Sequence, residues 1–229
     1  MKQIATEAIL LKRMNYGEAD RIVTVLTADY GRISMLAKGV RKSKSKLAGG
    51  LELFSVTDIN YIDGRSDLKT IISTRLREHY RNIVSDVDRT MAGYDFMKII
   101  DAFTQHADEP KYFKLLVQGL AGLNDMNVPL SVTNVWFFAN ILQINGSDIN
   151  VEKPLGKPKF NEEEMYSFSY DDMSFYSDSS GQFGPSHIKF LRLVDRSLIP
   201  EQLLVIAGHD MLASDLQQIV KQSAMMHKA

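Results

Sequence analysis

Residues 4–37 read IATEAILLKRMNYGEADRIVTVLTADYGRISMLA, and this order of apolar runs and turn residues decides the fold. Three segments in it are rich in Ile, Val, Leu and Thr, which is typical of β-strands. These segments are residues 4–12, 21–27 and 32–37. Asn15-Tyr16-Gly17 and Asp29-Tyr30-Gly31 separate them with residues that favour tight turns. The stretch therefore predicts three consecutive strands.

Two further strands are expected before the pattern changes. After Gly49-Gly50, residues 53–62 alternate between two faces, and residues 68–74 follow the Asp63-Gly64 turn. Five short strands in about 75 residues are the number found in a small barrel, of which the OB fold is the common nucleic-acid-binding type. An SH3-like barrel has the same number of strands, so the count alone leaves both folds open.

From about Glu78 onwards the apolar residues follow helical spacing. Met91, Tyr94, Met97 and Ile100 recur every three residues and predict one apolar helix face. Further helices are expected to begin near Pro110 and Pro129, and the second of these to end at Asn145-Gly146. Helices are also expected at the end of the chain, over residues 185–194, 201–207 and 214–225.

Residues 146–184 break this helical pattern. They contain several Pro and Gly residues, an acidic run and short aromatic pieces, which predict an irregular insert with one small hairpin. The expected fold class is α+β, with an N-terminal five-stranded OB-fold β-barrel at residues 1–78. An all-α domain with an irregular insert is expected at residues 79–229.

Composition excludes several classes of function. The 229 residues include no Cys, which rules out a disulfide framework, a thiolate nucleophile and Cys-ligated zinc. The five His have no metal-ligand spacing, and no acid–base or nucleophile motif is present. We therefore expect a non-enzymatic protein without metal or cofactor. No apolar run approaches the roughly 18 residues of a membrane span, and no signal peptide is recognisable, so a cytoplasmic location without membrane contact is expected.

The charges are distributed unevenly along the chain. Residues 1–80 hold 14 Lys and Arg against 9 Asp and Glu, a net charge of +5. The remaining residues hold 13 against 19, a net charge of −6. The basic residues 1–80 indicate an anion-binding module, and the acidic residues 81–229 indicate a second module with a different function.

The strongest local signal is GRISMLAKGVRKSKSKLAGG at residues 31–50. Residues 30–51 contain no acid, and their cations are Arg32, Lys38, Arg41, Lys42, Lys44 and Lys46. We name residues 38–46 the basic loop. Its Gly and Ser residues allow a phosphate backbone to approach closely, and its cations can neutralise that backbone. The alternative is a loop that is merely solvated, with DNA held elsewhere on the barrel by Arg13 and Arg65.

Four aromatic residues of the barrel have two interpretations. Tyr16, Tyr30, Phe54 and Tyr61 could stack on bases or pack within the strands. Packing is favoured for Phe54, which stands at the head of an alternating strand. Tyr16 and Tyr30 lie in expected turns, where neither interpretation is preferred.

The N-terminal residues resemble the RecO family of DNA repair proteins. The resemblance rests on TEAILLK at 6–12, YGEADRIVTVLT at 16–27 and YGRISMLAKGVRKSKSK at 30–46, and it continues at LELF, 51–54, and at residues 68–72. It implies an OB fold followed by a helical domain. In many members a four-cysteine zinc finger stands where this chain has the insert 146–184, so the resemblance indicates a zinc-free member here.

The resemblance also implies a function. RecO proteins are non-enzymatic recombination mediators that bind single- and double-stranded DNA and anneal complementary strands coated with single-strand-binding protein (SSB). They work with RecR to load RecA, and the helical domain binds the acidic, Phe-ending SSB tail. Available cations for that tail are Lys111, Lys114, Lys189, Arg192 and Arg196. The alternative function from the residues alone is an OB-fold RNA-binding module.

Overall fold

The computed structural model describes residues 2–64, 66–105 and 110–227. Its contacts divide the chain into two compact units, Met1–Asn124 and Asp125–Ala229. The domain boundary expected at residues 78/79 coincides with the change from strands to helices, since the fifth strand ends at His79. The compact units divide later, because the first two helices belong to the same unit as the strands.

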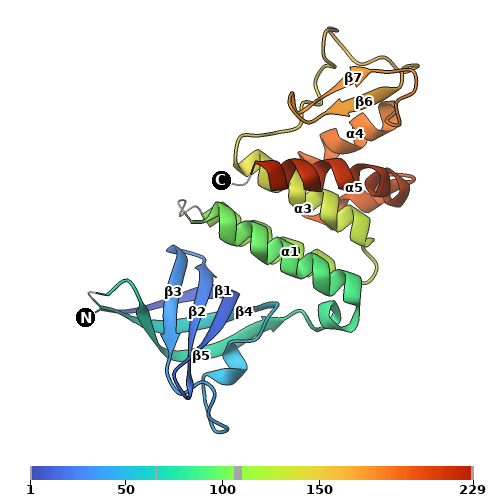
Figure 1. Cartoon of the computed structure of the whole chain (residues 1–229). Helices are drawn as coiled ribbons and strands as arrows, with labels where there is room; N and C mark the ends of the chain where they lie inside the picture. The colour runs from blue at the N-terminus through green and yellow to red at the C-terminus, as the bar shows by residue number, and fades with distance from the viewer. Residues whose placement is uncertain (1, 65, 106–109, 228–229) are drawn as a thin grey trace. The chain divides into compact units, whose positions relative to one another are not determined.

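The first unit contains a closed five-stranded barrel (Figure 1). Its strands are β1 (Lys2–Tyr16), β2 (Asp20–Thr27), β3 (Gly31–Ala37), β4 (Ser55–Asp63) and β5 (Lys69–His79). They pair in the order β1-β2-β3-β5-β4, and β4 pairs again with β1. The β3–β5 pairing is parallel and the other pairings are antiparallel. This Greek-key order confirms the α+β class with an N-terminal OB-type barrel.

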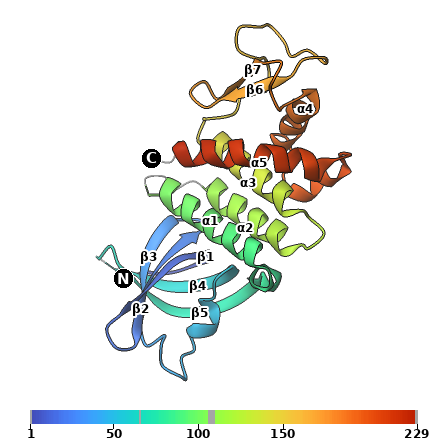
Figure 2. The ribbon, with the colours of Figure 1, turned by 45° about the vertical axis from the view of Figure 1, so that its right-hand side comes forward.

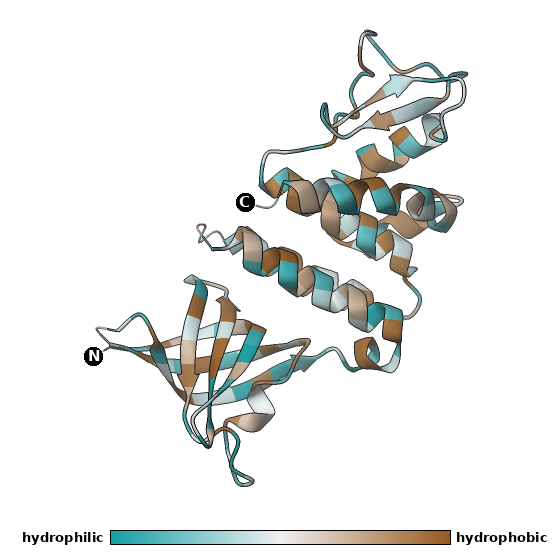
Figure 3. Ribbon diagram, viewed as in Figure 1, coloured by the Kyte–Doolittle hydropathy of each residue, from teal (hydrophilic) through white to brown (hydrophobic). Residues whose placement is uncertain are grey.

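The barrel core follows from the two-residue period of its strands. Apolar and polar residues alternate along them (Figure 3), and the inward set includes Val23, Met35, Ile59 and Ile71, all at most 4% exposed. A break in register between Leu10 and Lys12 bends β1, which lets this long strand pair with β4 at one end and β2 at the other.

Two helices, α1 (Val87–Phe103) and α2 (Pro110–Asn124), complete the first unit and run side by side (Figure 2). Asp86 caps α1 by accepting a hydrogen bond from the Arg89 backbone N–H. Phe54 adopts a left-handed backbone, φ 52°, and its buried ring lies against Gly93 of α1. A Cβ at Gly93 would lie 2.6 Å from the Phe54 ring, so only glycine fits between barrel and helix here.

The expected apolar face of α1 is only partly correct. Met97 and Ile100 are buried, whereas Met91 is 58% and Tyr94 44% exposed. A spacing of three residues falls short of a full helical turn by about 60°, so four such residues drift around the helix. The buried face also includes Phe96, Ile99 and Phe103.

The second unit is built on α3 (Leu130–Ile144), α4 (Pro185–Val194) and α5 (His209–Met226), with a 3₁₀ turn at Pro200–Val205 where a helix over 201–207 was expected. Trp136, Phe137 and Phe138 of α3 are at most 2% exposed. The Trp136 indole N–H donates to the Ser197 carbonyl at 3.0 Å, which satisfies the polar atom of this buried ring.

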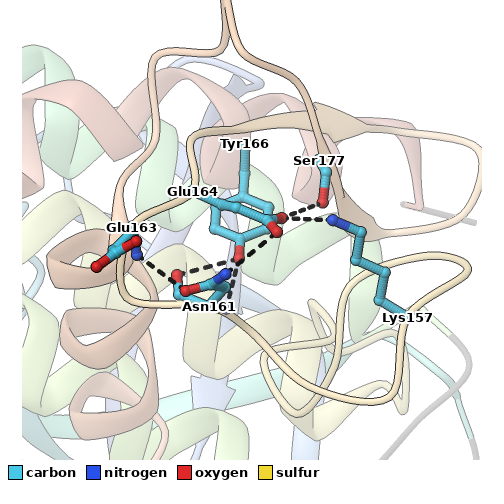
Figure 4. A network of polar contacts seen from close by, with 6 residues as sticks. All are labelled: Lys157, Asn161, Glu163, Glu164, Tyr166 and Ser177. Atoms are coloured by element: carbon cyan, nitrogen blue, oxygen red, sulfur yellow. Dashed lines mark hydrogen bonds and ion pairs between the residues drawn. The ribbon is translucent and has the colours of Figure 1, made fainter.

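The insert is an ordered hairpin module, formed by β6 (Tyr166–Ser169) and β7 (Ser174–Ser177). The rings of Phe160, Tyr166, Phe168, Phe175 and Phe183 meet edge to face, with centroids 5.0 to 6.3 Å apart. The Tyr166 hydroxyl accepts the Asn161 N–H at 2.7 Å, and Glu164 accepts hydrogen bonds from Lys157 and Ser177 (Figure 4). Aromatic packing and this polar network hold the module together.

The C-terminal end of α4 makes stability depend on pH. Burial, and secondly the nearby Asp148 carboxylate, raise the pKa of Asp195 to about 6. An ordinary aspartate titrates near 3.9 in an unfolded chain, so the folded state binds this proton more tightly. Stability from this group is therefore complete below about pH 4 and is lost as the pH rises through 6.

Asp195→Asn is consequently expected to raise the free energy of unfolding at pH 8 by about 1 kcal/mol, a value that allows for the partial exposure of the group. Thermal unfolding at pH 8 and pH 4 measures this, and the gain should vanish at pH 4. The matched control is Asp171→Asn, an exposed aspartate of the same unit. Equal gains at both pH values would contradict the account.

Candidate nucleic-acid interface

The basic loop is anchored to the β1–β2 turn. The Asp20 carboxylate accepts the Gly39 backbone N–H at 2.7 Å, and the Ala19 carbonyl accepts the Arg41 backbone N–H at 2.9 Å. Gly39 has a left-handed φ of 65°, a conformation that glycine adopts without strain. The start of the loop is thus fixed to the barrel end that carries the β1–β2 turn.

The loop folds so that its apolar residues point inwards. Val40 is 3% exposed and belongs to the barrel core, and Leu47, just beyond the loop, packs against that core. Two backbone bonds, from Lys42 N–H to Gly39 and from Ser45 N–H to Lys42, close successive turns. The Thr74 hydroxyl donates to the Leu47 carbonyl at 3.1 Å. The loop is therefore fastened to the barrel at both ends.

The loop cations point into solvent. All five of them are exposed, and no ion pair joins any of them to a carboxylate of the described residues. They are Lys38, Arg41, Lys42, Lys44 and Lys46. Binding of a phosphate by such a cation releases a condensed counterion, which favours association. A pre-formed row of cations without ion pairs therefore suits binding to a phosphate backbone.

The other three expected site residues lie elsewhere or are not described. Arg13 is exposed on β1, where it pairs with Val23 of β2. It lies two residues before Asn15, which is near the loop end of the barrel. Arg65 lies outside the described residues. Arg32 is at the other end of β3, about 20 Å from Lys38 at 3.3 Å per residue.

Arg32 has a partner that its position in the sequence does not reveal. Its Nε donates to Asp101 of α1 at 2.8 Å, and Lys12 of β1 forms an ion pair with the same carboxylate. The Asp101 side chain is only 4% exposed. Burial alone would raise its pKa, but the hydrogen bonds from Lys12 and Arg32 outweigh burial and hold the pKa below its ordinary value. Arg32 thus fastens α1 to the barrel.

Acidic residues gather at the barrel end remote from the loop. Glu7, Asp29 and Asp58 surround a shallow depression there. Arg77 pairs with Glu7 and lies 3.5 Å from Asp58. The acids at this end are thus partly compensated by Arg77, whereas the loop cations form no ion pair within the described residues.

The four aromatic residues separate by exposure. Phe54 and Tyr61 are at most 2% exposed and belong to the packing, whereas Tyr16 is 52% and Tyr30 45% exposed. Tyr16 ends β1 beside the anchored loop, and Tyr30 lies in the β2–β3 turn at the opposite end. Only Tyr16 combines an open ring with neighbouring cations, as single-strand binding surfaces do.

Tyr16→Ala is expected to weaken single-stranded DNA binding about tenfold, because one stacked base contributes about 1–3 kcal/mol. The salt dependence should not change, since no charge is removed. Fluorescence anisotropy with a labelled oligonucleotide measures both quantities. Tyr16→Phe should retain affinity, and Tyr30→Ala is the matched control at the other end. If Tyr30→Ala has the larger effect, the base-stacking surface lies elsewhere.

Sequence reasoning missed the residues that hold the loop in place. Ala19 ends the β1–β2 turn and Asp20 is the first residue of β2, and neither carries a binding motif in the sequence. Their role becomes visible once β2 is paired with β3, because Arg21 then stands opposite Ala37 and the turn lies beside the loop. The sequence around Asp20 did not indicate its hydrogen bond to Gly39, which is 19 residues away.

The described residues contain neither a metal-type cluster nor a helix able to cross a membrane. Over residues 2–64, 66–105 and 110–227, no three His, Asp or Glu side chains converge as metal ligands would. Within the same ranges, no helix is both long enough and apolar enough to cross a membrane.

Comparison with known proteins gives a consistent result. A family model described as the N-terminal domain of recombination protein O matches residues 1–80. The DNA repair protein RecO of Desulfatibacillum aliphaticivorans is 32% identical over 150 residues, covering 64% of this chain and 58% of that protein. RecO of Streptomyces griseus is 35% identical over 131 residues, covering 54% and 53% respectively. RecO of Dehalococcoides mccartyi is 31% identical over 142 residues, covering 62% and 55%. These matches span little more than half the length of each relative.

Proposed function

The chain belongs to the RecO family, and from this premise we propose that it is a non-enzymatic DNA repair and recombination mediator. It binds single- and double-stranded DNA through the basic loop, anneals complementary strands coated with SSB, and helps RecR to load RecA. The observation that carries this proposal is the loop itself, with five exposed cations that form no ion pair within the described residues, on a pre-formed backbone.

The chemistry of the loop fits binding without sequence readout. Lys and Arg side chains on a loop contact phosphates, which are the same in every sequence. A cationic surface also lowers the mutual repulsion of two DNA strands, which is the physical requirement for annealing. Nothing in this arrangement needs a nucleophile or an acid–base pair. The expected activity is therefore binding and strand pairing rather than bond cleavage.

Equilibrium binding to three oligonucleotides tests this proposal against the alternative of an RNA-binding module. Single-stranded DNA, its duplex and an RNA of the same sequence are titrated with the full chain at equal salt. Binding of both DNA forms supports the mediator. Binding of RNA alone would support the alternative, since RNA-specific modules read the 2′-hydroxyl.

A second proposal concerns the SSB tail, for which a cationic pocket in the second unit is the candidate site. The cavity, of about 160 Å³, has the apolar side chains of Phe160, Pro185 and Ile188 in its wall. Its charged lining residues are Lys159, Lys189 and Arg192 against Glu152 and Glu162, a net positive set in which Lys189 pairs with Glu162 at 2.9 Å. The Arg192 guanidinium lies 5.6 Å from the Phe160 ring centroid. An apolar wall with cations beside it suits a C-terminal Phe and its carboxylate.

The other proposed tail cations are not at this cavity. Lys111 and Lys114 lie on α2 in the first unit, and Arg196 follows α4 without lining the cavity. The pocket therefore brings together two of the five candidates, both on α4.

Lys189→Ala is expected to weaken binding of an SSB tail peptide about fivefold, because it removes one exposed charge from the rim. Deleting the terminal Phe of the peptide should abolish binding, since the apolar wall then has no partner. Isothermal titration calorimetry measures both effects. Lys153→Ala, an exposed lysine that does not line the pocket, is the matched control. Undiminished binding of the truncated peptide would refute this mode of recognition.

A further inference from the structure

A second concave surface lies in the same unit, between the hairpin module and α5. This groove has a volume of about 610 Å³ and shares no residue with the cationic pocket or the basic loop. One wall is formed by β6, β7 and the segment that follows them, and includes Phe168, Tyr170 and Tyr176. The facing wall is the middle of α5, with Asp215 and Gln218. We name it the acidic groove.

The charge of the groove is negative. Asp178 and Asp215 are its only charged lining residues within the described chain. Asp178 accepts hydrogen bonds from the hydroxyls of Ser167 and Ser180, at 2.7 Å each. These bonds hold the pKa of Asp178 below its ordinary value. Neutral hydroxyls satisfy the carboxylate without cancelling its charge.

The charge of Asp215 is also uncompensated. Its carboxylate lies 3.0 Å from His187 Nε2, and the Gly184 backbone N–H donates to the other ring nitrogen, Nδ1. A histidine that accepts at Nδ1 carries its proton at Nε2 and is neutral. His187 therefore donates a hydrogen bond to Asp215 but contributes no positive charge. The Asp215 side chain is 50% exposed and available to a ligand.

The hairpin contributes an open backbone edge to the groove. Tyr166 of β6 exchanges both backbone hydrogen bonds with Phe183, on the side away from β7. Because a strand repeats every two residues, the Phe168 N–H and C=O point to the same side. No hydrogen bond on that side joins them to another residue in the described part of the chain. One donor and one acceptor are thus free at the groove wall.

We propose that the acidic groove binds an extended basic segment of a partner protein, which pairs with the Phe168 backbone and places Lys or Arg beside Asp178 and Asp215. Extended peptides add to open strand edges in this way. Tyr176, 40% exposed, offers a ring face to such a cation. The two carboxylates repel phosphates, which disfavours nucleic acid, and they equally disfavour the acidic SSB tail proposed for the cationic pocket.

The test uses the full chain and a synthetic seven-residue peptide in which Lys or Arg alternates with Val. A counterpart carries Glu at each basic position. Gln218→Lys places a cation in the groove and is expected to weaken binding of the basic peptide five- to tenfold. Gln222→Lys, on the same helix outside the groove, should change binding less than twofold. The Glu peptide should not bind.

Amide hydrogen exchange gives a second readout. The Phe168 amide should exchange more slowly when the basic peptide is bound, because its N–H becomes hydrogen-bonded. The proposal is overturned if Gln218→Lys binds as tightly as the parent, or if the Phe168 amide is not protected. It is also overturned if Tyr176→Ala weakens binding of a single-stranded oligonucleotide and leaves peptide binding unchanged.

Discussion

Replacing Arg41, Lys42 and Lys44 with Ala is expected to weaken single-stranded DNA binding about 100-fold at 0.1 M salt. Each cation that contacts a single strand contributes about 0.7 to the slope of log affinity against log salt. Five exposed loop cations predict a slope near −3.5, and removing three flattens it by about 2. The loss should be the same for all base sequences, because phosphates are not sequence-specific.

The fold should survive this triple substitution. The three side chains are exposed, and the sole side-chain bond described for them, from Arg41 to the Gly17 carbonyl, is long at 3.5 Å. Exposed substitutions change stability by about 0.5 kcal/mol or less. A charge-matched control removes three exposed cations of the second unit that lie outside the cationic pocket, Lys153, Lys157 and Arg196. It should change affinity less than twofold. An unchanged slope in the folded loop variant would place the DNA elsewhere, for example on Arg13.

Asp101→Asn is expected to destabilise the first unit by about 2–3 kcal/mol at pH 7. Removing one partner of a buried ion pair costs about 3–5 kcal/mol, and the partial exposure of Lys12 and Arg32 lowers that value. Asn keeps the shape of the side chain, so the loss reports the charge rather than a cavity. Thermal unfolding followed by circular dichroism should show the melting temperature falling by about 5–10 °C.

The sign of the pH dependence provides a check on Asp101. Because its pKa is lowered in the folded state, its contribution is complete above the unfolded pKa near 3.9 and is lost as the pH falls below it. The difference between parent and Asp101→Asn should therefore shrink in acid. Glu162→Gln, which breaks an exposed ion pair with Lys189, is the control and should cost less than about 0.5 kcal/mol. Equal losses for both variants would mean that Asp101 does not fasten α1 to the barrel.

The barrel and its basic loop were predictable from the sequence because local signals specify both. Turn residues mark the strand ends, and an acid-free run of cations is visible without any pairing information. The helix over 185–194 was predicted at its true bounds, since Pro185 marks its start. Each of these features depends on residues that are neighbours in the chain.

The remaining features depend on contacts between distant residues. Arg32 was grouped with the loop cations because it stands six residues before Lys38, yet its partner Asp101 is 69 residues away. Asp20 and Gly39 are 19 residues apart. The hairpin module was expected to be mainly irregular because its strands have four residues each. Its order comes from aromatic rings that meet only after folding.

The most direct measurement of the central claim is annealing of complementary oligonucleotides, each coated with SSB, followed by the loss of fluorescence as a dye and a quencher come together. The parent chain should accelerate annealing, and the Arg41, Lys42 and Lys44 triple variant should remove most of that acceleration while remaining folded. The control that removes Lys153, Lys157 and Arg196, none of which lines the cationic pocket, should anneal as the parent does. A parent chain that binds DNA but leaves the annealing rate unchanged would contradict the proposed function. A folded loop variant that anneals at the parental rate would contradict the role of the loop.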